Sequence, residues 1–364
     1  MARPHPALIA LAATGEFPGA TDESELVRSA REHRMTGLLW TATANAPIGD
    51  AVAFEQLKAH AERAEHWNGR LWETLGVAVG RLADVGVEVA AIKGVTSEAR
   101  WYRRLGERPC RDIDLLLGPN DLGRAAEVIR ALQPGHPMAS MAQPWITRGA
   151  LQAATLSIDD VTVDVHFDPL KLGIPCRQAE LVWSRTHAAD LPGGGTVRLL
   201  DPEVSLILFL LHLNKDRFRY LLGLVDVQRV LAQEEIDRDF VAKFLAVEGL
   251  SRPAALSLEV VSETLGCEVP SLPRARGIRT RVWAMTWRPS IQLRGEEGRV
   301  RYRKRQELIP LLGRGRVREG LANGWRVLVP PRALYEIANP GEPGGYLRRL
   351  VVTRPVRYVR RLRP

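Results

Sequence analysis

The first ninety residues carry hydrophobic positions at helical spacing. One such segment spans residues 21–46 and begins beside Asp22, a residue type that often caps a helix. A longer segment spans 51–84, and Gly86 follows it as glycines often follow a helix C-terminus. The pattern therefore predicts two helical segments in this part of the chain.

The hydrophobic period changes after residue 86. Short apolar or alternating segments, as found in β-strands, now lie between segments of helical spacing. Asp159 and Asp160 join the last two of the strand-like segments as a tight hairpin turn. The expected strands are 87–92, 111–118, 153–158 and 161–167, and the expected helices between them are 95–102 and 120–132. We infer an α+β fold, with a small mixed β-sheet flanked by helices.

From Pro202 to about residue 266 the spacing is helical again, and a Pro/Arg/Gly-rich segment, 271–281, follows as a linker. We therefore expect a division of the chain into four parts. These are an N-terminal helical region (1–86), a mixed-sheet core (87–200), a helical domain (201–273) and a basic C-terminal region (274–364).

Two aspartates begin the second expected strand. Alternate strand residues share a face, so Asp112 and Asp114 point the same way and lie roughly 6–7 Å apart along the strand. Two like charges there are costly unless a cation lies between them. Asp164 and His166 repeat the arrangement on a later strand, and an adjacent strand would set Asp164 beside the first pair. Such oxygen ligands suit Mg²⁺ or Mn²⁺, which share their coordination shell with substrate phosphates.

A Lys-Gly turn precedes these aspartates. Gly94 follows a strand and begins a helix, so phosphate can approach its backbone and the helix N-terminus favours anions. Lys93 adds a positive charge for the same phosphates. Each element also has a simpler explanation, because turn glycines and strand aspartates are common, and His166 is equally consistent with a core histidine.

The motif order "IKG…Y…R…RDIDLLL…VDVHF" resembles the uncharacterised nucleotidyltransferase family of the DNA polymerase β-like superfamily. The resemblance implies a small mixed sheet with flanking helices, use of an NTP and Mg²⁺, and transfer of a nucleotidyl group with loss of pyrophosphate. It also extends to the helical region after the sheet. By this resemblance Gly94 is the turn glycine, Asp112 and Asp114 are the first two metal carboxylates, and Asp164 is the third.

The chain departs from the superfamily at the turn, where Gly94-Val95 stands in place of Gly-Ser or Gly-Gly. One phosphate-binding hydroxyl is missing, and Thr96 or Ser97 is expected to supply it. The residues expected to bind the nucleotide, which we take to be ATP, are Lys93, Gly94, Thr96, Ser97 and Arg111. Possible accessory residues are His166, His212, Lys215 and Asp226. For His212 the alternative is a core position, and for Asp226 it is a pair with an arginine.

Charge divides the chain unevenly. Residues 274–364 contain 23 Lys+Arg and 6 Asp+Glu, a net charge of +17, whereas the whole chain has +9. This asymmetry indicates either a polyanionic partner or an arginine-rich solvated surface. The acceptor of the nucleotidyl group stays open between a small molecule, a peptide and RNA. The alternative function is a catalytically weak NTP- or RNA-binding protein that acts through the basic C-terminal region.

Other features narrow the class of protein. Three widely spaced cysteines argue against a disulfide framework, and no apolar run is long enough to span a bilayer. The apolar segment 7–13 mimics a weak signal peptide, but a short helix explains it better. We therefore expect a cytoplasmic protein. Motifs of P-loop enzymes, dinucleotide-binding enzymes, zinc metalloproteases and serine hydrolases are missing from the sequence.

Overall fold

The computed structural model describes residues 4–44, 47–140, 152–172, 175–191, 195–216 and 218–269. The linker 271–281 and the basic region 274–364 lie outside these residues. The polyanion contact expected from the basic region therefore stays a prediction, as does the four-part division of the chain.

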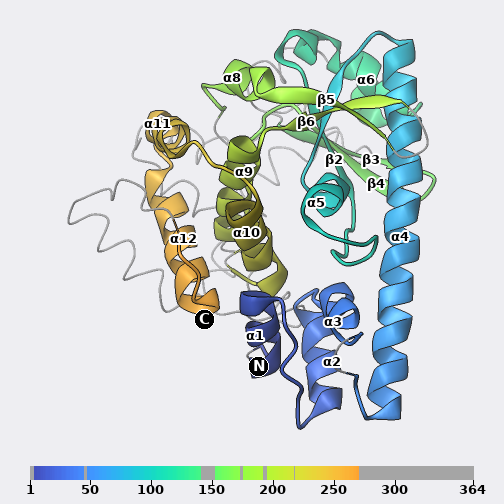
Figure 1. Cartoon of the computed structure of the whole chain (residues 1–364). Coiled ribbons are helices and arrows are strands. Elements are labelled where there is room, and N and C mark those ends of the chain that lie inside the picture. The colour runs from blue at the N-terminus through green and yellow to red at the C-terminus, as the bar shows by residue number, and fades with distance from the viewer. Residues whose placement is uncertain are drawn as a thin grey trace, which may run out of the picture.

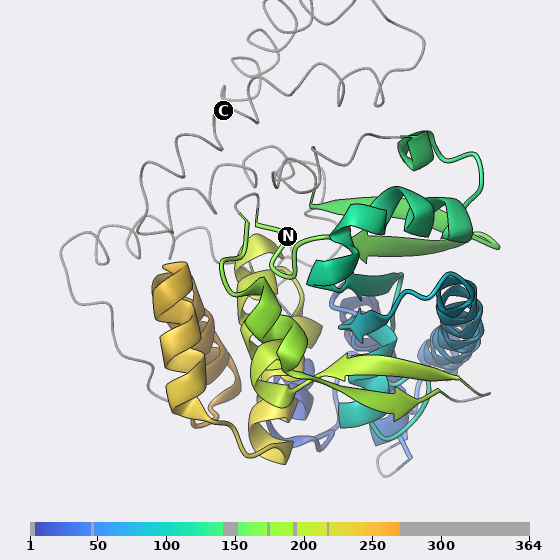
Figure 2. The same cartoon turned by 90° about the horizontal axis from the view of Figure 1, so that it is seen from above.

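A six-stranded mixed sheet forms the centre of the described part, with the strand order β3-β4-β2-β1-β6-β5. The central strands β1 and β2 are antiparallel, while β2 pairs with β4 and β1 pairs with β6 in parallel. Antiparallel hairpins form both edges (Figure 2). The strands are β1 (Val89–Ile92), β2 (Ile113–Leu117), β3 (Ala153–Ile158), β4 (Val161–His166), β5 (Thr186–Asp190) and β6 (Thr196–Leu200). The predicted α+β fold with a small mixed sheet is confirmed.

The hairpin of β5 and β6 was not expected from the sequence. Only the first residue of β5, Thr186, is buried, and the strand contains two alanines and an aspartate, which are poor strand formers. An exposed edge strand has little hydrophobic alternation from which it could be predicted. Residues 186–190 therefore form a strand mainly because they pair with β6, and less because of their own strand propensity.

Helices cover both faces of the sheet (Figure 1). The helices α4 and α6 pack on the face that carries Ile113 and Leu115. On the opposite face, α5 contacts β1 and β2, and α10 packs against α5. The α-helices are α1 (Pro6–Thr14), α2 (Glu23–Glu32), α3 (Thr36–Ala42), α4 (Ala51–Asp84), α5 (Gly94–Trp101), α6 (Ala125–Leu132), α8 (Ala179–Ser184), α9 (Pro202–Asp216), α10 (Leu221–Gln233), α11 (Arg238–Glu248) and α12 (Ser251–Leu265), and the 3₁₀ helices are η1 (Pro119–Arg124) and η2 (Pro137–Ser140).

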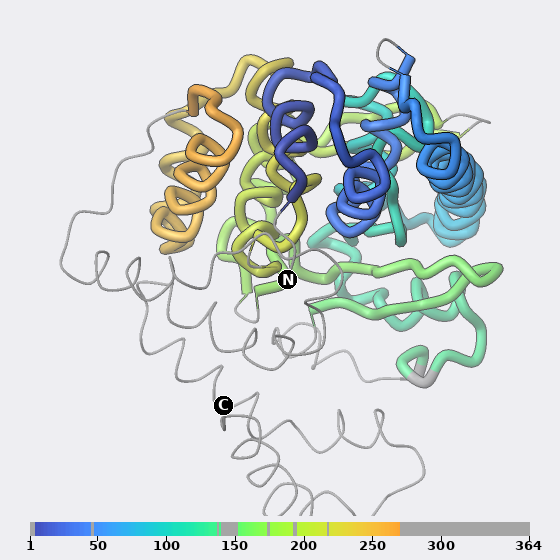
Figure 3. Tube along the Cα trace, turned by 90° about the horizontal axis from the view of Figure 1, so that it is seen from below, coloured from blue at the N-terminus to red at the C-terminus, as the bar shows by residue number. Residues whose placement is uncertain are grey.

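The N-terminal helices pack against one another and also against helices that lie far away in the sequence. Helix α1 contacts α10 and α12, and their apolar residues share one hydrophobic cluster (Figure 3). The Gln228 side chain also donates a hydrogen bond to the Ala13 carbonyl oxygen. Helix α4 is 34 residues long and joins the two clusters. Its first half, with Leu57, packs in this cluster, and its second half, with Leu75, packs under the sheet.

Several smaller expectations can be compared with the structure. The apolar N-terminal segment forms the short helix α1. The long helical pattern after Pro202 divides into α9 and α10, with Phe218 between them in a left-handed conformation (φ 55°). All three cysteines are free. Within the described ranges, no helix combines the length and hydrophobicity needed to cross a bilayer.

Candidate metal and nucleotide site

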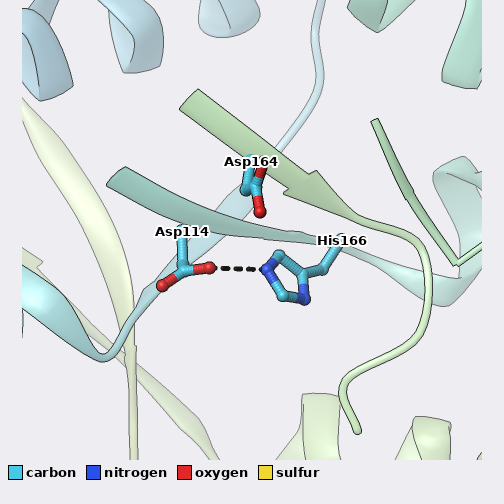
Figure 4. A group of neighbouring side chains, drawn as sticks. All are labelled: Asp114, Asp164 and His166. Atoms are coloured by element: carbon cyan, nitrogen blue, oxygen red, sulfur yellow. Dashed lines mark hydrogen bonds and ion pairs between the residues drawn. The ribbon is translucent and has the colours of Figure 1, made fainter. Parts of the chain in front are cut away.

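Two neighbouring parallel strands bring the central acidic residues together. Asp114 of β2 lies opposite Asp164 of β4 in the strand register, so the two side chains are neighbours on one face of the sheet. His166 lies two residues further along β4, on the same face as Asp164. One potential ligand atom from each of the three residues lies within 4.8 Å of the others (Figure 4).

His166 holds Asp114 by a hydrogen bond. Its Nε2 atom lies 2.7 Å from Asp114 Oδ1, and its Nδ1 atom has no hydrogen-bond partner among the described residues. Burial lowers the pKa of His166, and the Asp114 carboxylate only partly opposes this shift. The imidazole is therefore neutral at pH 7, with its proton on Nε2, where it donates to the carboxylate. In this tautomer His166 orients Asp114 and leaves Oδ2 of Asp114 for another ligand.

The two aspartates of the DID motif have different environments. Burial opposes ionisation of Asp114, but the Lys93 charge and the His166 hydrogen bond outweigh it, so the pKa of Asp114 lies well below its usual value. For Asp112, burial and then the charges of Asp114 and Asp164 raise the pKa. Asp112 precedes β2 and lines the same pocket, but it is not part of the compact three-residue group. The three predicted carboxylates thus share a pocket, and a common metal position stays a prediction.

Both oxygens of Asp164 have partners. Thr155, its neighbour on β3, donates from Oγ1 to Oδ1 at 2.5 Å, and Lys171 Nζ lies 2.7 Å from Oδ2. Lys171 belongs to the loop that follows β4, in a left-handed backbone conformation (φ 46°). The Lys171 ammonium, in the loop after β4, thus lies against a carboxylate of β4 itself.

The turn between β1 and α5 has two successive residues with positive φ, and the first of them is strained. Lys93 has φ 56°, a conformation that side chains disfavour and that clusters at functional sites, whereas Gly94, with φ 44°, adopts this region without strain. The Lys93 ammonium has no hydrogen-bond or ion-pair partner among the described residues, although its charge acts on Asp114 and Asp112. Lys93 therefore stands available for an anionic ligand.

Thr96 and Ser97 lie in α5 and are buried. The Thr96 hydroxyl donates to the Lys93 carbonyl oxygen at 2.6 Å, which supports the turn. Neither residue is part of the pocket wall, whereas Lys93, Gly94 and Arg111 are. The structure therefore shows a turn-supporting bond for Thr96, and its contact with phosphate stays a prediction.

A pocket of about 340 Å³ connects these groups with the helical region. Three accessory candidates, His212, Lys215 and Asp226, line it together with His166. His212 is half-exposed, with Nε2 3.1 Å from Asp216 Oδ2, so it is not a core histidine. Burial opposes ionisation of Asp216, but the charge and hydrogen bond of His212 outweigh it, so the pKa of Asp216 lies well below its usual value.

Asp226 forms the arginine pair that was one of its two expected roles. Arg108 Nε and Nη2 lie 2.7 Å from Asp226 Oδ1 and Oδ2, and the Tyr102 hydroxyl donates to Oδ1 at 2.6 Å. The Arg108 and Asp226 side chains are only 13% and 6% exposed. This network fixes the segment before Asp112 to α10.

The comparisons with known proteins identify the family of the chain. The sequence model of a family described as "Uncharacterised nucleotidyltransferase" matches residues 19–266. The chain belongs to this family. Among solved structures, a crystal structure of an antigenic nucleotidyltransferase-like protein from Paracoccidioides brasiliensis is similar, with 14% identity and a TM-score of 0.33 over 55% of this chain and 94% of that chain. A search of curated proteins finds no match.

Some residues that line the pocket of this nucleotidyltransferase family member were not predicted from the sequence. Arg34, at the junction of α2 and α3, lines the pocket with a left-handed backbone (φ 60°) and stacks on the Tyr220 ring, 4.0 Å from its centroid. Lys171 and Asp216 were also missed. Nothing local in the sequence marks these residues, since the pocket is assembled from segments far apart in the chain.

The donor set of the family member fits a hard divalent cation. Asp112, Asp114 and Asp164 line one pocket, and burial together with the charges of the other two aspartates raises the pKa of Asp112, a cost that a bound cation relieves. Asp114 and Asp164, which lie together, would hold the ion, and Asp112 as a third ligand stays a prediction. His166 Nε2 donates to Asp114, which suits an orienting role better than direct ligation.

Proposed function

We propose that the protein transfers a nucleoside monophosphate from an NTP, taken as ATP, to an acceptor hydroxyl, with release of pyrophosphate. The observation that carries the proposal is the pairing of Asp114 with Asp164 on adjacent parallel strands, beside the strained Lys93-Gly94 turn. Family membership supports transferase chemistry and an NTP substrate. The identity of the acceptor, the choice of ATP and the cytoplasmic location are proposals that family membership does not supply.

The proposed role of each residue follows from its position in the pocket. A bound Mg²⁺ or Mn²⁺ stabilises the charge that develops on the reacting phosphate oxygens. Lys93 and the N-terminus of α5 bind the phosphates, with Arg111 at the pocket rim. The acceptor oxygen forms a bond to the α-phosphorus, the bond from that phosphorus to pyrophosphate breaks, and Asp164 accepts the hydroxyl proton. His166 holds Asp114 in its orientation throughout.

The acceptor is best sought by labelling. Purified full-length protein is incubated with each of the four NTPs carrying a labelled α-phosphate, with Mg²⁺ or Mn²⁺ and a cell extract. We expect label from one NTP to enter one class of molecule, and nuclease, protease or solvent extraction identifies that class as RNA, peptide or small molecule. Label that stays in free nucleotide under every condition would contradict the proposal.

Asp114→Asn is the sharpest variant for this test. The amide keeps the shape of the side chain but loses the charge that binds a cation, so transfer should fall by at least about a hundredfold, or some 2.7 kcal/mol of transition-state stabilisation. The matched control is Asp159→Asn at the exposed hairpin turn, where φ is 48° and asparagine is well tolerated. Normal transfer by Asp114→Asn, or equal loss in the control, would exclude Asp114 from the chemistry.

A further inference from the structure

Asp164 is a predicted metal carboxylate whose two oxygens already have protein partners. The partner of Oδ1 is the Thr155 hydroxyl, which is neutral and can rotate away. The partner of Oδ2 is the Lys171 ammonium at 2.7 Å, and both side chains are largely shielded from water, at 29% and 16% exposed. A cation at Oδ2 and an ammonium at the same atom repel each other, because neither charge is fully screened.

Hydrogen bonds to a buried carboxylate hold the backbone at Lys171. The buried Asp168 carboxylate accepts the backbone N–H groups of Leu170 and Lys171 at Oδ1, each at 3.0 Å, and that of Cys176 at Oδ2, at 2.6 Å. The bonds to Leu170 and Lys171 hold the backbone at Lys171, which has a left-handed conformation. The backbone from which the Lys171 side chain reaches Asp164 is therefore held in place by Asp168.

We propose that Lys171 sets the metal affinity of this site, because its ammonium must leave Asp164 Oδ2 before a divalent cation binds that oxygen. The inference rests on the proposed function, in which Asp164 is a metal ligand. Lys171 lines the pocket that also contains Lys93, so the displaced ammonium stays where NTP phosphates would bind. When metal and nucleotide bind together, the Asp164 carboxylate binds the cation and the Lys171 ammonium binds the phosphates. The site thus binds metal weakly alone and more tightly with nucleotide.

Lys171→Met tests the proposal, since methionine keeps the length of the side chain without its charge. Mn²⁺ alone is titrated into full-length protein, and free Mn²⁺ is followed by electron paramagnetic resonance. We expect Lys171→Met to bind Mn²⁺ roughly 5- to 30-fold more tightly than the wild type, the range that follows from losing one ion pair of moderate strength. Lys171→Arg keeps the charge and should bind like the wild type.

Lys215→Met is the matched control. Lys215 lines the same pocket but has no ion pair with Asp164 among the described contacts, so this variant changes the pocket charge equally and leaves the contact intact. Its Mn²⁺ affinity should rise much less than that of Lys171→Met. An equal rise in both variants would show general electrostatics and overturn the proposal, as would unchanged or weaker binding by Lys171→Met. Lys171→Gln serves as a second variant if the methionine protein does not fold.

Asp114→Asn separates this inference from the proposed function. If that variant still binds Mn²⁺ as the wild type does, the metal site itself is wrong and both proposals fail. If it loses Mn²⁺ binding while Lys171→Met binds like the wild type, the metal site stands and only the role of Lys171 fails. A fluorescence titration of labelled ATP, with and without Mn²⁺, adds a second readout. The gain in Mn²⁺ affinity on adding ATP should be smaller in Lys171→Met than in the wild type.

Discussion

Replacing Asp226 by asparagine should destabilise the protein strongly, although Asp226 lines the pocket. The carboxylate receives two charge-assisted hydrogen bonds from Arg108 at 2.7 Å and a third from Tyr102 at 2.6 Å. An asparagine keeps one acceptor oxygen but turns an NH₂ group toward the guanidinium, so a donor faces a donor. The Arg108 charge is then left buried without its counter-ion.

The magnitude follows from that burial. Breaking a buried ion pair by removing one partner costs about 3–5 kcal/mol, several times the value of an exposed pair. With an unfolding entropy of about 2.1 cal/mol/K per residue, each kcal/mol lowers the Tm of this 364-residue protein by about 1.3 °C, so Asp226→Asn should lower Tm by roughly 4 to 7 °C. Arg108→Met should cost a similar amount, because it leaves the Asp226 carboxylate buried.

A double-mutant cycle tests the origin of the loss. Thermal unfolding is measured for Asp226→Leu, Arg108→Met and the double variant, with circular dichroism as the signal. Because the double variant removes both charges, it should lose at least about 2 kcal/mol less than the sum of the single losses. Single losses below about 1 kcal/mol, or additivity within about 0.5 kcal/mol, would refute a buried structural pair and favour a role for Asp226 in the pocket chemistry.

Two further predictions concern stability. His33 is fully buried, both ring nitrogens lack hydrogen-bond partners among the described residues, and burial lowers its pKa to about 4. As pH falls, the His33 imidazole is protonated in the unfolded chain before it is protonated in the folded one. Up to about 3 kcal/mol of stability, present above pH 6.5, should therefore be lost as pH falls toward 4. His33→Leu should flatten this part of a plot of Tm against pH, and an unchanged slope would contradict the assignment. A Cβ at Gly37 would overlap the Gly106 carbonyl oxygen, so Gly37→Ala should cost several kcal/mol in urea unfolding. Gly80→Ala, in open space on α4, should instead stabilise by about 0.5–1 kcal/mol; equal effects of the two substitutions would show that α3 does not pack as described.

Local pattern was sufficient for much of the sheet. The β3–β4 hairpin follows from two alternating segments and the Asp159-Asp160 turn, whose residues have φ of 48° and 66°. A two-residue turn also fixes the register, which places Thr155 opposite Asp164. The Thr155–Asp164 hydrogen bond was therefore within reach of the sequence, although it was not predicted.

Other parts depend on contacts that no local pattern contains. The compact group of Asp114, Asp164 and His166 requires β2 to lie beside β4, and β1 and β6 to lie on the other side of β2. The position of Arg34 requires α2 and α3 to pack near α10. In both cases the decisive step is the packing of distant segments, which periodicity along the chain does not specify.

The packing of α1 against α10 and α12 also sets an order of events during synthesis. Leu8 and Leu11 share a hydrophobic cluster with residues of α10 and α12 that are synthesised more than 200 positions later. At about 5–20 residues per second, that interval lasts about 10 to 40 s. For this time α1 can contact α2 and α3 but not α10 and α12, so part of its apolar surface stays exposed on the nascent chain and is a natural target for chaperones that bind exposed hydrophobic residues. Completion of α12 then closes the N-terminal cluster and ends that exposure.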